Sequence, residues 1–304
     1  MEQRYLTVLL GSSVDLFYRI DSYPAEGDYT YGSEDGKRAG GPPFNAGCVA
    51  SSLGVPVKAL DYLNPEDEDY RILLDTLKEY GVDTSPIRFG TDCTLGKVLI
   101  FNRNEKRTML VINQARPFYP PDEQIRELLN GSRYIYTMIH MMQRFFGDDS
   151  PIREARRNGA KMIFDGSDKY ADPGRAMMLL ELADGLFINS TDYVHLSDCL
   201  GEDAKGALLR AGCEFICVTD GENGASCYTK DLALFHPAYR LEQVVDSTGA
   251  GDSFAGTFMA CRIMGKSYEE SLKLASAAGA WCCLHEGGQG GCASLDDLER
   301  FIGA

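Results

Sequence analysis

The sequence has few of the residues on which metal centres and nucleic-acid interfaces usually depend. It contains four histidines, and none of its ten cysteines forms a C-x-x-C pair, so no zinc-ligand spacing occurs. No run of five or more basic residues interrupts a formal net charge of −15. We therefore expect no nucleic-acid partner and no anionic-membrane partner.

Long apolar runs and targeting segments are also missing. No segment approaches the ~18 apolar residues that a membrane span needs. The first residues lead into a short strand, not into the apolar core of a signal peptide. The cysteines are then expected to be reduced, buried or half-buried thiols of a cytoplasmic protein. Because the chain is acidic, a polyanionic ligand would need a metal ion or backbone N–H groups at its site.

The composition is that of a globular protein. The 304 residues are 44% hydrophobic and 25% charged, which is neither disordered nor fibrous. This length suits one large α/β domain or two ordinary ones. No internal repeat or low-complexity segment divides the chain.

Two parts of the N-terminal half read as β-hairpins. Residues 5–11 form an apolar run that ends at a glycine, as in a buried parallel strand. Residues 16–37 alternate aromatic and polar side chains between glycines, and residues 94–113 alternate again around a turn at 102–107. The two hairpins are predicted to form one small separate sheet. Between them, residues 65–80 read as a helix whose acidic start is solvated and which stops at Gly81.

From about residue 121 onward, helical segments alternate with short apolar strands. The predicted strands cover residues 134–138, 161–165, 185–189 and 214–219, and residues 225–241 read as a hairpin at the sheet edge. Such alternation implies parallel βαβ units. A helix is predicted from Gly251 to Gly265, and a capping box at 267–270 opens the next one. The expected fold is a doubly wound, mainly parallel α/β sheet with a small β-sheet lid.

The most informative stretch runs from Asp246 to Gly256 and reads Asp-Ser-Thr-Gly-Ala-Gly-Asp-Ser-Phe-Ala-Gly. Gly249, Ala250 and Gly251 have little or no side chain, so the backbone can turn tightly and direct its N–H groups outward. The apolar spacing that follows indicates that a helix starts here. Free N–H groups and the positive end of the helix dipole together predict an anion site.

Asp252 adds a carboxylate to the first turn of this helix, beside the predicted anion site. Acidic residues favour helix starts anyway, so Asp252 could simply be a cap. Alternatively, it could accept a proton from an attacking hydroxyl while the N–H groups stabilise a phosphoryl group in transfer. The flanking glycines favour the second interpretation.

Two further glycine turns are candidates for ligand binding. Residues 40–45 read Gly-Gly-Pro-Pro-Phe-Asn and fix a rigid turn, where the Asn45 amide could bind a polyol or lie at an ordinary helix start. The stretch from Thr219 through Gly221 to Gly224 follows a predicted strand and could cradle nucleotide phosphates or form a hairpin. The G-x-G-x-x-G fingerprint is absent, so an NAD site gains little support.

These stretches resemble the two signatures of the ribokinase-like, or PfkB, carbohydrate kinase family. Residues 40–47 resemble the first signature, and residues 246–256 are a highly specific match to the second. The resemblance extends across nearly the whole chain to the glycine-rich loop at 287–291. It implies one ribokinase-like kinase domain over residues 1–304, with a lid sheet inserted from about 16–38 and 94–114.

The resemblance also implies an activity and a set of site residues. The activity is transfer of the γ-phosphoryl group of ATP, with Mg²⁺, to a hydroxyl of a sugar or nucleoside. By analogy Asp252 is the base, and the backbone of Gly249, Ala250 and Gly251 is the anion hole. The acceptor would be held by Asp15, Gly41 and Asn45, the nucleotide phosphates by Asn189, Thr219, Gly221 and the Gly224 turn, and a monovalent cation such as K⁺ by Asp246 and Thr248.

Two stretches depart from the family pattern. Residues 189–192 read Asn-Ser-Thr-Asp where the family commonly shows Asn-x-x-Glu, so Asp192 is a candidate for indirect Mg²⁺ binding with a shorter side chain. Residues 165–169 read Asp-Gly-Ser-Asp-Lys where many sugar kinases carry Asp-x-Asn-x-Arg. Lysine lacks the planar fork of arginine, so a different acceptor is implied.

Several questions stay open at this level. Arg107, on the second lid hairpin, could reach the acceptor or phosphoryl oxygens or be solvated. The leading prediction is a sugar kinase. Its alternatives are a nucleoside or vitamin kinase on the same fold and a catalytically silent sugar-binding regulator. The sequence does not identify the acceptor, and the lid could pair across a homodimer or remain a flap.

Overall fold

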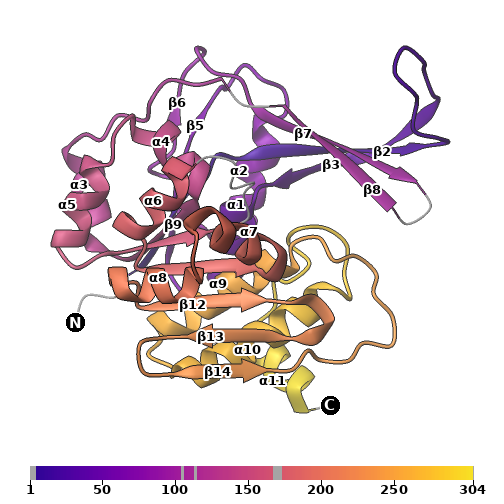
Figure 1. Cartoon of the computed structure of the whole chain (residues 1–304). Helices are drawn as coiled ribbons and strands as arrows, with labels where there is room; N and C mark the ends of the chain where they lie inside the picture. Colours follow the sequence, from indigo (N-terminus) through magenta and orange to yellow (C-terminus); the bar gives the residue numbers. More distant parts are fainter. Residues whose placement is uncertain (1–4, 104–105, 113–114, 167–172, 304) are drawn as a thin grey trace.

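The computed structural model describes residues 5–103, 106–112, 115–166 and 173–303. A large sheet runs through the molecule, and a small sheet extends from one side of it (Figure 1). The strand order of the large sheet is β14-β13-β12-β11-β10-β9-β1-β4. Six strands are parallel, and β13 and β14 form an antiparallel hairpin at the edge. The strands are β1 (Tyr5–Leu9), β4 (Val57–Leu60), β9 (Ser132–Met138), β10 (Lys161–Asp165), β11 (Gly185–Asn189), β12 (Phe215–Thr219), β13 (Ala225–Tyr228) and β14 (Ala233–His236).

Helices cover both faces of the large sheet because successive side chains of its buried strands point to opposite faces. Tyr136 and Phe187 belong to one apolar core, whereas their neighbours Ile135 and Leu186 belong to the other. On the first face lie α1 (Pro42–Ser52), α2 (Tyr70–Glu79), α9 (Ala250–Ile263), α10 (Tyr268–Cys282) and α11 (Leu295–Gly303). On the second lie α3 (Glu123–Gly131), α4 (Ile139–Phe146), α5 (Ser150–Arg157), α6 (Pro173–Leu182), α7 (Ser190–Leu200) and α8 (Ala204–Ala211). The predicted doubly wound fold is confirmed.

None of the helices in the described part of the chain combines the length and apolar character that crossing a bilayer requires. The predicted capping box is present at the start of α10, where the Ser267 hydroxyl accepts from the Glu270 amide and the Glu270 carboxylate accepts from the Ser267 amide. Helix α9 begins at Ala250, within one residue of the predicted start.

The small sheet is the predicted lid. It consists of β2 (Ser13–Ile20), β3 (Gly32–Gly40), β7 (Gly96–Arg103) and β8 (Lys106–Ile112), in the order β3-β2-β7-β8. Both expected hairpins are antiparallel, and the parallel pairing of β2 with β7 joins them. We call these four strands the lid and the rest of the molecule the body. The body also carries a short parallel pair, β5 (Tyr62–Leu63) and β6 (Arg88–Phe89).

The helix predicted from residue 65 begins later, at Tyr70. Asn64 and Asp67 explain the difference, because their side chains accept hydrogen bonds from the amides of Glu66 and Asp69 and hold the chain in turns. The expectation of a solvated acidic start is also wrong for Asp69. Its side chain is buried, and it accepts a hydrogen bond from Lys37 of the lid at 2.9 Å.

Parallel strands end at the same edge of a sheet, and ligands of open α/β sheets bind there. Asp165, Asn189 and Thr219 are the last residues of β10, β11 and β12. Gly11, just after β1, leads into the lid at this same edge. The fold therefore brings side chains that lie far apart in the sequence to one edge of the large sheet.

Candidate active site

Three backbone amides at the start of helix α9 have no hydrogen-bond acceptor in the part of the chain that the structure describes. Gly249 is its N-cap with φ 80°, and a Cβ there would lie 2.4 Å from the carbonyl oxygen of Gly288, so only glycine fits. The amide of Ala250 donates to the Ser247 carbonyl at 3.3 Å. Among the described residues, nothing accepts from the amides of Gly249, Gly251 or Asp252. These three amides can therefore receive an anion.

The carboxylate of Asp252 lies beside these amides and is half-buried. The side-chain amide of Asn45 donates to its Oδ2 atom at 2.6 Å. Burial and the nearby charges of Asp165 and Asp15 raise the pKa of Asp252 to about 7, although the bond from Asn45 acts in the opposite direction. A carboxylate with this pKa can take up and release a proton near neutral pH.

Asp15, on strand β2 of the lid, lies close enough to Asp252 for its charge to act on that carboxylate. The Ser13 hydroxyl donates to its Oδ1 atom at 3.1 Å. Burial raises the pKa of Asp15 to about 6, against the effects of that hydrogen bond and of the Arg107 charge. Gly40 leaves the space that the carboxylate occupies, because a Cβ at Gly40 would lie 2.3 Å from Asp15 Oδ2.

Asn45 is held between Asp252 and Gln289, a residue that the sequence did not single out. Its Oδ1 atom accepts from the Gln289 side chain at 2.6 Å, and Gln289 also donates to the Ala39 carbonyl at 3.1 Å. Asn45 is therefore oriented with its amide nitrogen toward Asp252. The only hint of Gln289 in the sequence is its place in a glycine-rich loop. The nearby Gly41, at φ 112°, is the N-cap of α1.

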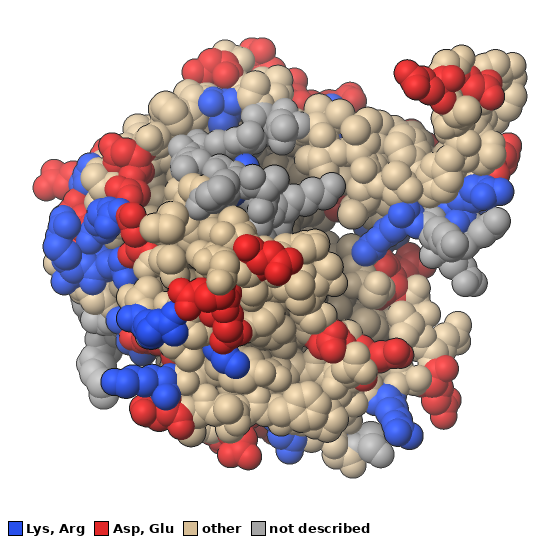
Figure 2. Space-filling view, viewed as in Figure 1, with Lys and Arg blue, Asp and Glu red and all other residues tan. Residues whose placement is uncertain are grey.

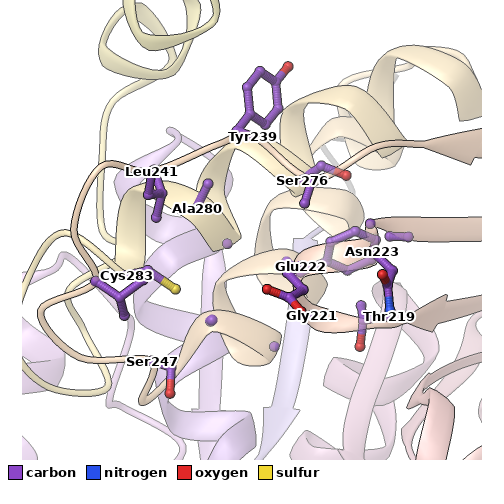
Figure 3. Close-up of a pocket in the computed structure, with 18 of the residues that line it drawn as sticks. Thr219, Gly221, Glu222, Asn223, Tyr239, Leu241, Ser247, Ser276, Ala280 and Cys283 are labelled. Atoms are coloured by element: carbon purple, nitrogen blue, oxygen red, sulfur yellow. The ribbon is translucent and has the colours of Figure 1, made fainter.

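A pocket of about 750 Å³ opens next to the start of α9. Figure 3 shows Leu241 and Cys283 on one side of it and Glu222 and Asn223 on the other. Further lining residues are Thr219, Gly221, Gly224, Tyr239, Val244, Ser247, Ala250, Gly251, Phe254, Gly279 and Ala280. The pocket combines apolar walls with one end at the free amides. Its volume falls within the roughly 300–1,000 Å³ of small-molecule and cofactor sites.

The predicted phosphate-binding turn contributes to this pocket. Gly221 opens a short 3₁₀ turn. Gly224 has φ 113°, and a Cβ there would lie 2.3 Å from the His236 carbonyl oxygen, so a side chain would not fit. Asn189 lies beside Thr219 in the sheet but does not belong to the lining. Its side chain caps α7, accepting from the Asp192 amide at 2.8 Å and donating to the Asp192 carboxylate at 2.6 Å.

The loop before α9 is tied to the lid. Asp246 accepts from the amide and hydroxyl of Thr248 and from the amide of Gly287. Arg107 of β8 donates to the Thr248 hydroxyl and lies 3.7 Å from Asp246. Burial alone would raise the pKa of Asp246, but these hydrogen bonds and the Arg107 charge hold it below its usual value. Arg107 is thus paired with the body and not simply solvated.

No group of three or more His, Cys, Asp or Glu side chains that could hold a metal ion occurs within the described ranges. Ser167 and Lys169, which depart from the family pattern, lie outside those ranges. Asp165, the first residue of that stretch, is buried, and its Oδ2 atom accepts from the Tyr136 hydroxyl at 3.0 Å.

The charge on the surface is mixed on the face that Figure 2 shows. On the face shown in Figure 2, lysine and arginine side chains alternate with acidic ones, and the lid stands away from the body on one side. A small anionic ligand is then attracted by local groups, such as the amides of α9, more than by a broad basic surface.

Comparison with known proteins gives the family. The sequence profile of the "pfkB family carbohydrate kinase" matches residues 7–294. The chain belongs to this family. The resemblance noted in the sequence is confirmed, and the chain is a carbohydrate kinase. Its relatives include the deoxyribokinase of Salmonella typhi, which is 24% identical over 314 residues that cover 98% of both proteins.

Solved structures of the same fold agree with this assignment. The ribokinase of Arabidopsis thaliana, solved with ribose and ATP, superposes with a TM-score of 0.84 at 21% identity and covers 98% of each chain. The nucleoside kinase of Methanocaldococcus jannaschii, described as an archaeal member of the ribokinase family, gives a TM-score of 0.79 at 17% identity, covering 99% of this chain and 98% of that one. At these identities the likeness of the pfkB-family chain to the two structures is one of fold.

Proposed function

We propose that this pfkB-family kinase transfers the γ-phosphoryl group of ATP to a hydroxyl of a small sugar-like acceptor, with Asp252 as the general base. One observation carries the proposal. The Asp252 carboxylate lies in the first turn of α9, next to Gly251, which lines the pocket and has a free amide; it accepts from Asn45 and lies near the charge of Asp15. Such a position suits a base between a phosphoryl donor and a hydroxyl acceptor.

The nucleotide would occupy the pocket beside α9. Its apolar part, with Leu241, Val244 and Ala280, suits a purine ring, and its other end includes Gly251, whose amide is unpaired and is followed by the unpaired amide of Asp252. Those amides would hold the γ-phosphoryl oxygens and stabilise the charge that develops on them during transfer.

Mg²⁺ would bind mainly through the nucleotide. Magnesium is commonly held by substrate phosphates and one or two carboxylates, and no metal-binding cluster occurs in the described part of the chain. Asp192, whose carboxylate accepts from Asn189 at the end of β11, is the residue that would hold the ion through water. Bound there, the ion would neutralise phosphate charge. The oxygens of Asp246 already accept several protein hydrogen bonds, so K⁺ binding at that loop stays a prediction and no step depends on it.

The chemistry requires no covalent enzyme intermediate. Asp252 accepts the proton of the acceptor hydroxyl while that oxygen attacks the γ-phosphorus in line. The bond between the γ-phosphorus and the bridging oxygen breaks, and ADP leaves with the electron pair. The protein supplies position and fixed charge, which account for most of the rate in phosphoryl transfer.

The acceptor is the least determined part of the proposal. Asp15 can accept from hydroxyls, while Gly41, which has no side chain, lets a ligand approach the backbone closely. The names of the relatives suggest a panel of ribose, deoxyribose, fructose and nucleosides. The best acceptor should raise the melting temperature most and release the most ADP. Binding of a nucleoside alone would favour the nucleoside-kinase alternative, and binding without ADP release would favour a silent regulator.

Asp252→Asn tests the base. We expect kcat to fall by a factor on the order of 10² or more, while the nucleotide Kd stays near that of the wild type, because the amides that bind phosphate are unchanged. Asp231→Asn, an exposed aspartate on the β13–β14 turn, is the matched control and should leave both quantities unchanged. Near-normal turnover of Asp252→Asn would show that another group is the base.

A further inference from the structure

A buried ion pair lies outside the proposed catalytic groups. Arg116 Nη1 is 2.7 Å from Asp61 Oδ1, and the side chains are 5% and 0% exposed. The guanidinium also lies over the ring of Phe145, 4.8 Å from its centroid. Burying two charges costs as much free energy as their attraction returns, so a buried pair is weak evidence for a role in stability alone.

The pair lies where the lid joins the body. The chain passes between body and lid four times: after β1, after β3, before β7 and after β8. Asp61, between β4 and β5, accepts from the backbone amide of Ser12 at 3.1 Å in the first passage. Arg116 belongs to the fourth passage. The third is tied to the fourth, because Thr94 and Ala115 exchange two hydrogen bonds.

The body holds Asp61 firmly. Its carbonyl accepts from the Arg88 amide at 2.9 Å, and its carboxylate accepts from the Tyr62 amide at 2.8 Å. The preceding residue, Leu60, accepts from the Leu10 amide at 2.9 Å, which joins β4 to β1. Asp61 is therefore a rigid point of the body to which three of the four lid passages are attached directly or through one neighbour.

Two polar atoms beside this point lack partners. Within the described ranges, Arg116 Nη2 and the Ser12 hydroxyl are buried without a hydrogen bond. Unsatisfied buried groups are uncommon and often mark a place with more than one arrangement. The Nη2 atom of Arg116 is thus available to donate a hydrogen bond when the lid takes another position.

We propose that the Asp61–Arg116 pair is the pivot of the lid and a positioning pair for the acceptor side of the reaction. The inference rests on the proposed function, because it takes the lid as the cover of the acceptor. Strand β2 brings Asp15 to the site three residues after Ser12, and β8 brings Arg107 there before the chain returns to Arg116. A loosened pivot leaves both groups less well placed against Asp252.

The variants are Asp61→Asn and Arg116→Met, with Arg116→Lys as a milder change should either fail to fold. The matched controls are Asp184→Asn and Arg156→Met. Arg156 donates to Asp184 through two nitrogens at 2.8 and 3.0 Å, and this pair is also largely buried, at 28% and 8% exposure. It joins α5 to the segment before β11 in the body, far from the lid passages.

Hydrogen exchange of the ligand-free protein is the first readout. In the pivot variants, amides of β2, β3, β7 and β8 should exchange about tenfold faster relative to those of β10–β12, because the lid opens independently of the body. In the control variants, lid and body amides should change together. A pivot variant whose lid and body exchange change in parallel would overturn the proposal.

Steady-state kinetics are the second readout. The KM for the acceptor should rise about tenfold in the pivot variants, while the KM for ATP stays within about twofold, because the nucleotide pocket lies in the body. Equal rises in both KM values would also overturn the proposal. If the wild-type protein phosphorylates no acceptor, the proposed function fails, but the exchange experiment still decides whether the pair is the pivot.

Discussion

At the residue scale, the chemistry of the site depends on carboxylates that stand close together. Asp252 lies near the charges of Asp165 and Asp15, and Asn45 donates a hydrogen bond to it. Burial, together with these two like charges, disfavours ionisation and raises the pKa of Asp252 to about 7. Because a base acts only when ionised, Asp252 would serve as the proposed base mainly above this pKa.

The pH dependence of kcat/KM tests this arrangement, because kcat/KM reports the pKa of the free enzyme. We expect it to rise with pH and to level off above about pH 7, as Asp252 loses its proton. Asp165→Asn removes one negative neighbour, lowers the pKa of Asp252 and so moves the rising limb to lower pH. The Tyr136 hydroxyl can still donate to the new side chain. Asp231→Asn should leave the profile unchanged, and an unshifted profile in Asp165→Asn would contradict the coupling.

At the element scale, the Arg107 side chain connects the lid hairpin β7–β8 to the loop before α9. Arg107 bonds Thr248 and lies near Asp246, while Arg103 of the same hairpin turns away and donates to the Asp21 carbonyl at 2.8 Å. The two arginines are similar in chemistry and differ in which element they contact. Substituting each arginine in turn therefore separates the effect of the contact between lid and loop from the effect of positive charge on the hairpin.

Arg107→Met should lower kcat/KM about tenfold at low ionic strength, because the lid loses its charged contact with the loop that shapes the anion site. The difference from the wild type should narrow at high salt, since the pair is partly exposed and screened. Kinetics at two ionic strengths measure this. Arg103→Met serves as the control and should change kcat/KM little. If both variants lose activity equally, the contact with Thr248 and Asp246 is not the cause.

The elements that the sequence predicted best are those whose signals are local. Strands β10 and β11 match the predicted residues at both ends because short apolar runs are bounded by polar or glycine residues. The start of α2 was wrong because side chains of Asn64 and Asp67 capture amides that a helix would use. The Gln289–Asn45 bond joins residues 244 positions apart and leaves no local pattern.

At the scale of the whole molecule, the lid has two edges of different character. Strand β3 carries Glu34, Asp35, Lys37 and Arg38, whereas β8 exposes Met109, Leu110, Val111 and Ile112, each 45–61% accessible. Charges on an edge strand prevent pairing with another chain, and an apolar edge invites it. Figure 1 shows β8 at the side of the molecule where the lid extends away from the body.

We propose that two copies of the chain pair through β8, because pairing along this strand covers an exposed apolar edge without disturbing the body. Light scattering during size exclusion at micromolar concentrations should give twice the 33.5 kDa chain mass. Leu110→Lys should shift the protein to the monomer, because it places a charge on the pairing edge. Leu110 lies on the opposite face of β8 from Arg107, so the charge leaves the active-site face unchanged. Ser33→Lys on the β3 edge should remain dimeric. A wild-type protein that is monomeric at every concentration measured would contradict the β8 dimer and leave β8 as the free edge of the lid in a single chain. In that case Leu110→Lys should still bind the acceptor normally.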